Sequence, residues 1–233
     1  MAPENSCGVW LGGLDSDRRH TALDARMTKL QGRSVCLVGN APTTFDRSGI
    51  VDGCDVVIRI NDASGFGGVN GHRLTHLFLI NCGGQMREWL DDPEFAVRPV
   101  VAAAAEILLP IHPAKDEMIV PPLTPAERSH PDAANYADEA RKMLEKHGKT
   151  VSVVSVEIFL QAAAIIGFER PERAMDAPST GLIALCWALE TFDDPIDIVG
   201  FGFAGWDGHR WGRERAFFEK LQAGGRIRLH PAG

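Results

Sequence analysis

Several features that stabilise or mark many proteins are scarce in this sequence. Among its 233 residues are five cysteines, an odd number, and no two of them form a CxxC pair. Structural zinc sites are commonly built from such pairs, so the sequence predicts no zinc centre. Scattered cysteines are typical of a reduced chain in which they serve as small core residues.

Long apolar runs and targeting signals are also absent. No run reaches the ~18 apolar residues that a membrane helix needs, and residues 1–13 lack the basic start and the apolar stretch of a signal peptide. We therefore expect a cytoplasmic protein without a transmembrane segment, for which a peripheral membrane contact stays open. The formal net charge of −7 argues against nucleic acid as a partner, because phosphate backbones select basic faces.

The common nucleotide-binding fingerprints are missing too. The chain has neither a GxGxxG fingerprint nor the spacing of a P-loop. The glycine-rich residues 64–71 have the wrong spacing and follow a polar turn, so we interpret them as a flexible loop. Residues 15–17 spell the DxD pattern of metal-dependent glycosyltransferases, but they follow no strand and are better explained as a helix-start cap.

What the sequence does contain is an alternation of apolar strands and helices. It predicts an α/β protein with a Rossmann-like, mostly parallel sheet and helices on both faces. We expect one domain at residues 32–233, preceded by an extension at 1–31 that is partly disordered or helical. Strands are predicted at residues 34–38, 55–60, 75–80, 99–104, 151–154, 196–199 and 226–229, and helices at 15–30, 85–90, 132–147, 155–167, 182–190 and 213–222.

The start of the apolar helix at 182–190 is a candidate anion site. Residues 178–181, Pro-Ser-Thr-Gly, place a hydroxyl side chain where it can cap this helix. A helix start with small hydroxyl residues and a glycine is a place where an anion can sit, because its first amides are free. We therefore expect Ser179, Thr180 and Gly181 to bind a phosphate or a carboxylate.

Asparagines end three of the predicted strands. Asn40, Asn61 and Asn81 each follow an apolar run, and Gly39 precedes Asn40 where a backbone could come close to a ligand. A single asparagine is best explained as a turn cap, but three at neighbouring strand ends indicate a shared crevice. Asparagine donates and accepts hydrogen bonds, so it suits sugar hydroxyls, phosphate or a base edge.

A histidine is the candidate general base. His209 lies in a loop rich in glycine and tryptophan, and Glu214 follows it by five residues. Histidine titrates near neutral pH, and Glu214 would orient it or hold the start of the next helix. The alternative is an ordinary surface histidine. His112 is a second candidate; it lies in residues 110–131, a segment with six prolines that we interpret as a lid or a binding loop.

Three short motifs, in this order, resemble those of the sialyltransferases, glycosyltransferase family 29. Residues 35–40 and 56–61 resemble the large sialyl motif, and residues 178–202 resemble the small one. His209 and Glu214, separated by four residues, match the very small motif. The middle of the chain, residues 64–175, matches the family only through its alternating pattern.

The resemblance implies a fold, a reaction and residue roles. The family folds as a variant of the GT-A fold and needs no metal or cofactor. It transfers sialic acid with inversion from CMP-sialic acid to a hydroxyl of an acceptor, here a glycan or a glycolipid. By this resemblance, the residues that contact the donor are Asn40, Asn61, Ser179, Thr180 and Gly181, and the catalytic base is His209.

The sequence departs from the family in two places. Cys36 matches one half of a disulfide found in the family's animal members, but the other position holds Phe192. The loop from Phe203 to His209 is too short for a further motif whose histidine contacts the donor phosphate. A related keto-sugar such as Kdo, or an inactive binding module of the same fold, therefore stays open. Candidates for phosphate or acceptor contact are Asn81, His112, Trp206, Arg210 and Arg213.

Overall fold

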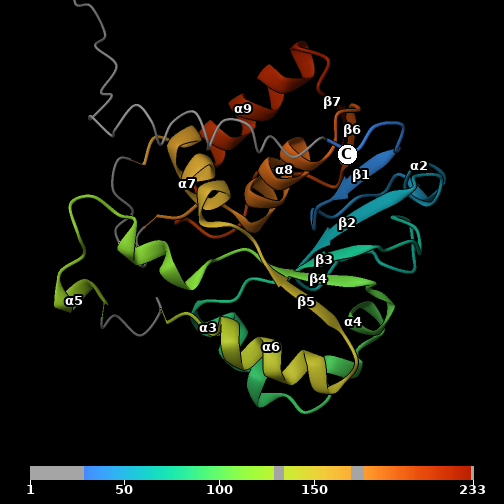
Figure 1. Cartoon of the computed structure of the whole chain (residues 1–233). Helices are drawn as coiled ribbons and strands as arrows, with labels where there is room; N and C mark the ends of the chain where they lie inside the picture. Colours follow the sequence, from blue (N-terminus) through green and yellow to red (C-terminus); the bar gives the residue numbers. More distant parts are fainter. Residues whose placement is uncertain (1–28, 129–133, 169–175, 232–233) are drawn as a thin grey trace, which may run out of the picture.

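The computed structural model describes residues 29–128, 134–168 and 176–231, and within them a seven-stranded sheet runs through the molecule (Figure 1). Neighbouring strands are parallel throughout, in the order β5-β4-β3-β2-β1-β6-β7. The winding reverses at β1, and ligands of such sheets bind outside the carboxyl ends of the strands at that point. The strands are β1 Val35–Val38, β2 Val56–Ile60, β3 His76–Phe78, β4 Glu106–Leu109, β5 Thr150–Val153, β6 Ile196–Val199 and β7 Ile227–His230.

Helices cover both faces of the sheet, so the predicted fold class is confirmed. The helices α7, α8 and α9 share one hydrophobic core with the sheet, and α3, α4 and α6 share another with the opposite face. The short α2 packs on the second face over β1 and β2. The helices are α2 Ser48–Asp52, α3 Gly83–Asp91, α4 Pro99–Ala103, α5 Pro125–Arg128, α6 Ala137–Lys146, α7 Val156–Ile165, α8 Thr180–Thr191 and α9 Trp211–Ala223, with 3₁₀ turns η1 Phe95–Val97 and η2 Pro113–Glu117.

The helix α8 is the most deeply packed helix beside the switch point of the sheet. Eight of its twelve residues are buried, because it lies between the sheet and its neighbour α7. It contacts β2, and the neighbouring strands β1 and β6 are buried along their whole length. Burying a leucine or isoleucine side chain contributes roughly 1.5–3 kcal/mol. This packing fixes the position of the α8 N-terminus at the edge of the sheet.

The strand predicted at residues 99–104 is wrong. These residues form α4, which begins with Pro99, and proline is favoured in the first helical turn because its missing N–H would be unpaired there anyway. The alanines that follow are strong helix formers. The strand that pairs with β3 is instead the next apolar run, Glu106–Leu109.

The remaining elements occur close to their predicted positions. Ser155 stands just before α7, but its side chain makes no capping bond. Residues 64–71 form a loop of turns, as predicted, and residues 110–128 contain only η2 and α5. Residues 1–28, which hold the DxD pattern and most of the predicted extension, lie outside the described residues. Within the described residues, no helix combines the length and the apolar character needed to cross a membrane.

The described cysteines are mostly core residues, as their pattern predicts. Cys36, Cys54 and Cys186 are buried free thiols. Burial raises the pKa of the Cys186 thiol to about 12, so it stays protonated at neutral pH. Phe192 packs edge-on against Trp187, with ring centroids 5.9 Å apart.

Candidate functional site

A buried carboxylate holds the start of α8. The Ser179 backbone N–H donates to Glu214 Oε1 at 2.9 Å, and the Ser179 hydroxyl donates to Glu214 Oε2 at 2.6 Å. The same hydroxyl accepts the Leu182 N–H at 3.0 Å, which is the predicted capping bond. Both Ser179 and Glu214 are buried. The one hydroxyl proton of Ser179 is therefore already engaged, and this side chain links α8 to α9.

Glu214 contacts the helix start and not the imidazole of His209. The sequence offers two roles for Glu214, to orient His209 or to hold the start of the helix that follows the loop. In the structure Glu214 holds a helix start, but that of α8 and not of its own helix α9. Burial raises the pKa of Glu214, and the two hydrogen bonds from Ser179 and the nearby His209 oppose that rise. A protonated or half-protonated carboxyl would still accept the Ser179 N–H, so the link persists across a wide pH range.

Two backbone amides at the start of α8 are free. Thr180 and Gly181 are its first residues, and neither N–H donates a hydrogen bond to another described residue. Free amides and the helix dipole together favour an anion at this point. A Cβ atom at Gly181 would lie only 2.8 Å from a ring carbon of Phe201. Glycine is therefore required for the helix start to pack against the segment that follows β6.

The carboxyl end of β2 lies beside this helix start. The Cβ position of Gly181 is 3.6 Å from Cδ1 of Ile60, the last residue of β2. Asn40 Nδ2 donates to the Ile60 carbonyl at 3.1 Å, and Asn40 Oδ1 accepts the Ser64 N–H at 2.9 Å. Asn40 thus ties the ends of β1 and β2 to the glycine-rich loop. The structure therefore places Asn40 and the end of β2 beside the predicted anion site.

Asn61 and Asn81 have different surroundings. Asn61 has a φ of 50°, which asparagine tolerates, and its Oδ1 accepts the Ile80 N–H at 3.0 Å. Its Nδ2 donates no hydrogen bond to a described residue and so is free for a ligand. Asn81 is buried: its Nδ2 donates to the Ile111 carbonyl and its Oδ1 accepts the Ile111 N–H, both at 2.8 Å. Asn81 therefore cross-links two chain segments and does not face the crevice.

Gly39 lets two backbones approach each other. Its N–H donates to the Val199 carbonyl at 2.8 Å, and a Cβ atom at Gly39 would overlap the backbone of Gly200. Gly200 itself has a φ of 70° and meets the Gly39 carbonyl in return. Gly39, which we predicted to face a ligand, instead allows the ends of β1 and β6 to lie in contact.

His209 is held with one ring nitrogen free. Its Nδ1 lies 2.7 Å from the Ala177 carbonyl, and because a carbonyl only accepts, Nδ1 carries the proton. In the neutral ring Nε2 is then the acceptor, and it makes no hydrogen bond to a described residue. Trp206 and Trp211 pack edge-to-face on the ring, with centroids 4.9 and 4.8 Å away. The ring is fixed in a defined tautomer, as a general base requires.

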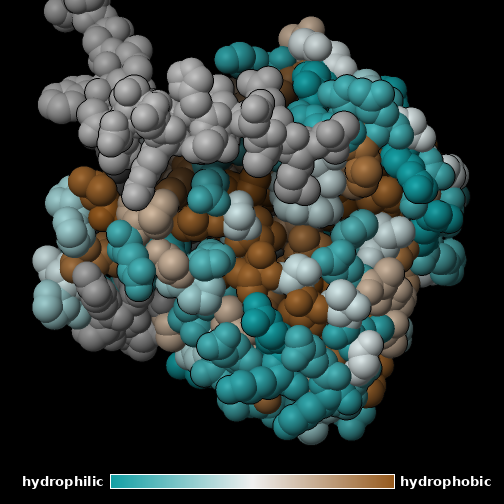
Figure 2. Space-filling model, in the orientation of Figure 1, coloured by the Kyte–Doolittle hydropathy of each residue, from teal (hydrophilic) through white to brown (hydrophobic). Residues whose placement is uncertain are grey.

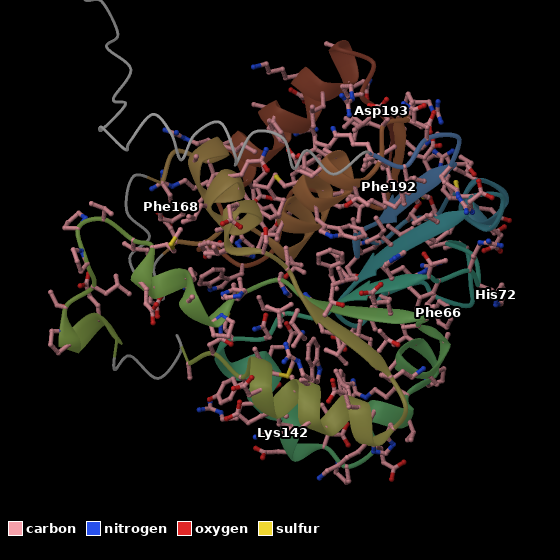
Figure 3. All side chains as sticks on the ribbon, in the orientation of Figure 1. Phe66, His72, Lys142, Phe168, Phe192 and Asp193 are labelled. Carbon is pink, nitrogen blue, oxygen red and sulfur yellow. The ribbon has the colours of Figure 1, made fainter. Side chains whose placement is uncertain are left out.

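The candidate phosphate contacts differ in how far they are engaged. Arg210 is tied down: its guanidinium donates to Asp176 at 2.7 Å, donates to the Gly167 carbonyl at 2.9 Å and stacks over Phe168, labelled in Figure 3. His112 Nδ1 accepts the Ala114 N–H at 3.1 Å and starts η2. Two candidates are exposed, Arg213 and Trp206.

Sequence reasoning missed Arg59, a fully buried arginine in β2. Its guanidinium donates to the carbonyls of Asn70, Gly71 and Arg73. It therefore organises the glycine-rich loop, whose Phe66 lies well apart from Phe168 in Figure 3. A charged residue inside an apolar strand was the available signal. Among the described residues, no group of three or more histidine, cysteine or acidic side chains is arranged to hold a metal.

Comparisons with known proteins relate this chain to two kinds of protein. No protein-family model matches it. The urease operon 23 kDa accessory protein of Rhizobium meliloti (strain 1021) is 26% identical over 208 residues, which cover 86% of this chain and 94% of that protein.

Two similar solved structures are sialyltransferases. The crystal structure of a mammalian sialyltransferase aligns with a TM-score of 0.53 and 18% identity, covering 86% of this chain and 70% of that one. The sialyltransferase CstII of Campylobacter jejuni, in complex with a substrate analogue, aligns with a TM-score of 0.48 and 12% identity over 87% of this chain. The first of these likenesses shows that the fold of this chain is sialyltransferase-like.

Proposed function

We propose that this chain is an inverting glycosyltransferase that uses a CMP-sugar. The sugar would be sialic acid or a related keto-sugar such as Kdo, and the acceptor a hydroxyl of a glycan or glycolipid. The sialyltransferase-like fold supports a nucleotide-sugar site at the carboxyl edge of the sheet. No metal or cofactor has a part in the proposed reaction, because the leaving group is a phosphate that departs as a stable anion.

The free amides of Thr180 and Gly181 would bind the negative charge of the donor, either its phosphate or its carboxylate. Asn61 Nδ2 and the end of β1 at Asn40 would contact the nucleotide. In the transfer, the bond from the anomeric carbon to the phosphate oxygen breaks and CMP leaves with the electron pair. The acceptor oxygen bonds to the same carbon, and His209 Nε2 takes its proton.

The observation that carries this proposal is the double hydrogen bond between Ala177 and the His209 loop. The Ala177 carbonyl accepts from His209 Nδ1 at 2.7 Å, and the Ala177 N–H donates to the Gly208 carbonyl at 3.0 Å. Ala177 lies two residues before the α8 cap, so base and anion site are built on one segment. Such shared support is what positions a base relative to a bound donor.

The test has two stages. Thermal shift with CMP, UDP, GDP and ADP comes first; a ligand at a hundred times its Kd stabilises by about 2.7 kcal/mol, which raises Tm by roughly 5–10 °C in a chain of this size. We expect the shift with CMP. Hydrolysis and transfer of CMP-sialic acid and CMP-Kdo are then measured for the wild type and for His209→Asn.

His209→Asn keeps a donor for the Ala177 carbonyl and removes Nε2, so turnover should fall by about 10²–10⁴ while CMP binding persists. His147→Asn, at an exposed histidine that ends α6, is the matched control. Unchanged turnover in His209→Asn would show that this histidine is not the base.

The second candidate function is a nucleotide-binding module of the same fold without catalysis. Two observations favour it: the relative of Rhizobium meliloti is named an accessory protein, and Arg210 is engaged in bonds within the chain. The module would show the thermal shift with CMP but no turnover with any acceptor. A chain that shifts with none of the four nucleotides contradicts both candidates.

A further inference from the structure

A groove lies on the sheet away from the His209 site. It has a volume of about 1220 Å³ and runs between α7, the C-terminal half of α8, and strands β4 and β5. In Figure 2, hydrophobic residues gather in the middle of this face, over the region that Figure 1 shows between α7, α8 and β5. Small-molecule sites are usually about 300–1,000 Å³. The groove therefore has the size for an extended ligand.

The groove has an apolar floor and an acidic rim. Leu108, Ile158 and Trp187 are among the apolar residues that line it. Four acidic residues line it as well, and Lys29 is the one basic residue among the described residues of the lining. The acidic residues are Glu106, Glu157, Glu190 and Asp193. An occupant that matches this surface carries apolar side chains on one side and basic side chains on the other.

The described chain begins at this groove. Lys29 Nζ donates to the Leu189 carbonyl at 2.6 Å, and the Leu30 N–H donates to the Thr191 carbonyl at 2.9 Å. Leu30 pairs in a parallel bridge with Phe192, the residue that follows α8, so the first described residues run beside the last turn of α8. That turn carries Glu190 and belongs to the wall of the groove.

The sequence before Lys29 fits the groove in charge and in pattern. Residues 18–29 contain four basic residues, Arg18, Arg19, Arg26 and Lys29, against one acidic residue, Asp24. Leu23 and Met27 are four residues apart and Leu30 follows three later, which is the spacing of one helical face.

We propose that residues 18–28 dock in this groove as an amphipathic helix. Leu23 and Met27 cover the apolar floor, and the arginines pair with the acidic rim. Ile158 and Trp187, which are half-buried beside the four carboxylates, would be covered by the chain's own N-terminal segment. This inference is independent of the proposed enzymatic activity, because the groove contains none of the residues of the His209 site.

Hydrogen exchange of the intact chain tests the proposal. The readout is the protection of the amides of residues 18–28, compared between the wild type and the double variant Glu157→Lys, Glu190→Lys. Both glutamates are exposed, so the fold should persist, and circular dichroism checks this. The matched control is Glu88→Lys, Glu145→Lys, which makes the same charge change at exposed positions of α3 and α6 on the opposite face of the sheet.

The expected result is protection in the wild type and in the control, and exchange about 5–30-fold faster in the groove variant, the factor that one or two kcal/mol of lost pairing produces. Equal exchange in all three proteins would overturn the proposal. Protection that grows with protein concentration, together with a dimer in light scattering, would also overturn it, because the groove would then hold a segment of a second copy.

Discussion

Removing the Glu214 side chain should loosen the start of α8 more than any other single change at the site. Glu214→Ala takes away the acceptors of the Ser179 N–H and of the Ser179 hydroxyl, which are bonded at 2.9 and 2.6 Å. Both partners are buried, so water cannot replace the carboxylate without opening the contact between α8 and α9.

The size of the effect follows from the two bonds. A hydrogen bond to a charged group contributes about 1.5–3 kcal/mol, and here two buried donors of Ser179 lose their acceptors, each at a cost of about 1–3 kcal/mol. We therefore expect Glu214→Ala to lower the free energy of unfolding by about 3–5 kcal/mol. Ser179→Ala loses the capping bond, about 0.5–2 kcal/mol, and the bond to Oε2, so about 2–5 kcal/mol is expected.

A double-mutant cycle isolates the bond itself. Urea unfolding of the wild type, Glu214→Ala, Ser179→Ala and the double variant should give a coupling energy of about 1.5–3 kcal/mol, because the hydroxyl bond is lost in each single variant. Ser155→Ala is the matched control: Ser155 stands before α7 in the same way but makes no capping bond. A coupling below about 0.5 kcal/mol, the scatter of independent sites, would refute the reasoning.

Three further predictions concern pH and buried amides. Burial raises the pKa of Glu214, so the folded state favours the protonated carboxyl. The stability of the wild type relative to Glu214→Gln should therefore be largest below the unfolded pKa of about 4.3 and should fall as pH rises through the folded pKa. A difference in unfolding free energy between the two proteins that instead grows in favour of the wild type with rising pH would contradict this. Burial alone would raise the pKa of Asp197, but hydrogen bonds from Arg228 and His230 lower it overall. The wild type should therefore be more stable than Asp197→Asn above pH about 4, and this advantage should vanish as pH falls. Acid unfolding monitored by circular dichroism measures the difference. Asn81→Ala should destabilise by about 1–3 kcal/mol, since it leaves the buried Ile111 N–H unpaired while Asn135 Nδ2 still donates to the Ile111 carbonyl, yet it should leave CMP affinity in calorimetry unchanged.

The sequence predicts the architecture well because hydrophobic period and glycine placement are local signals. Residues 35–38, for example, are apolar without interruption, a pattern that a strand covered on both faces favours. The one wrong strand, at 99–104, mixed valines with alanines after a proline. Residues 106–109 form the strand that pairs with β3 instead, and nothing in the local sequence of 99–104 indicates this pairing.

The site was predicted less completely, because hydrogen-bond partners far apart in sequence decide which polar groups are free. The pattern at the start of α8 predicts that Ser179 caps the helix. Nothing local shows that its hydroxyl also donates a hydrogen bond to Glu214, 35 residues later. In the same way Arg210 looks like a free cation until Asp176 is placed beside it. Residue type identifies the candidates, and only the fold shows which of them are already engaged.

The short loop after β6 gains a physical explanation from this arrangement. Phe203 has a φ of 50°, a strained conformation for a large residue, and its ring packs on Phe218 of α9 with centroids 5.0 Å apart. The turn at Phe203 brings the chain to His209 within six residues, and the Ala177 carbonyl then fixes the imidazole. A longer loop is not needed to place His209, the proposed base, because the segment that begins α8 supports both its imidazole and the two amides without a described partner. Any change that moves the start of α8 should therefore alter donor binding and proton transfer together.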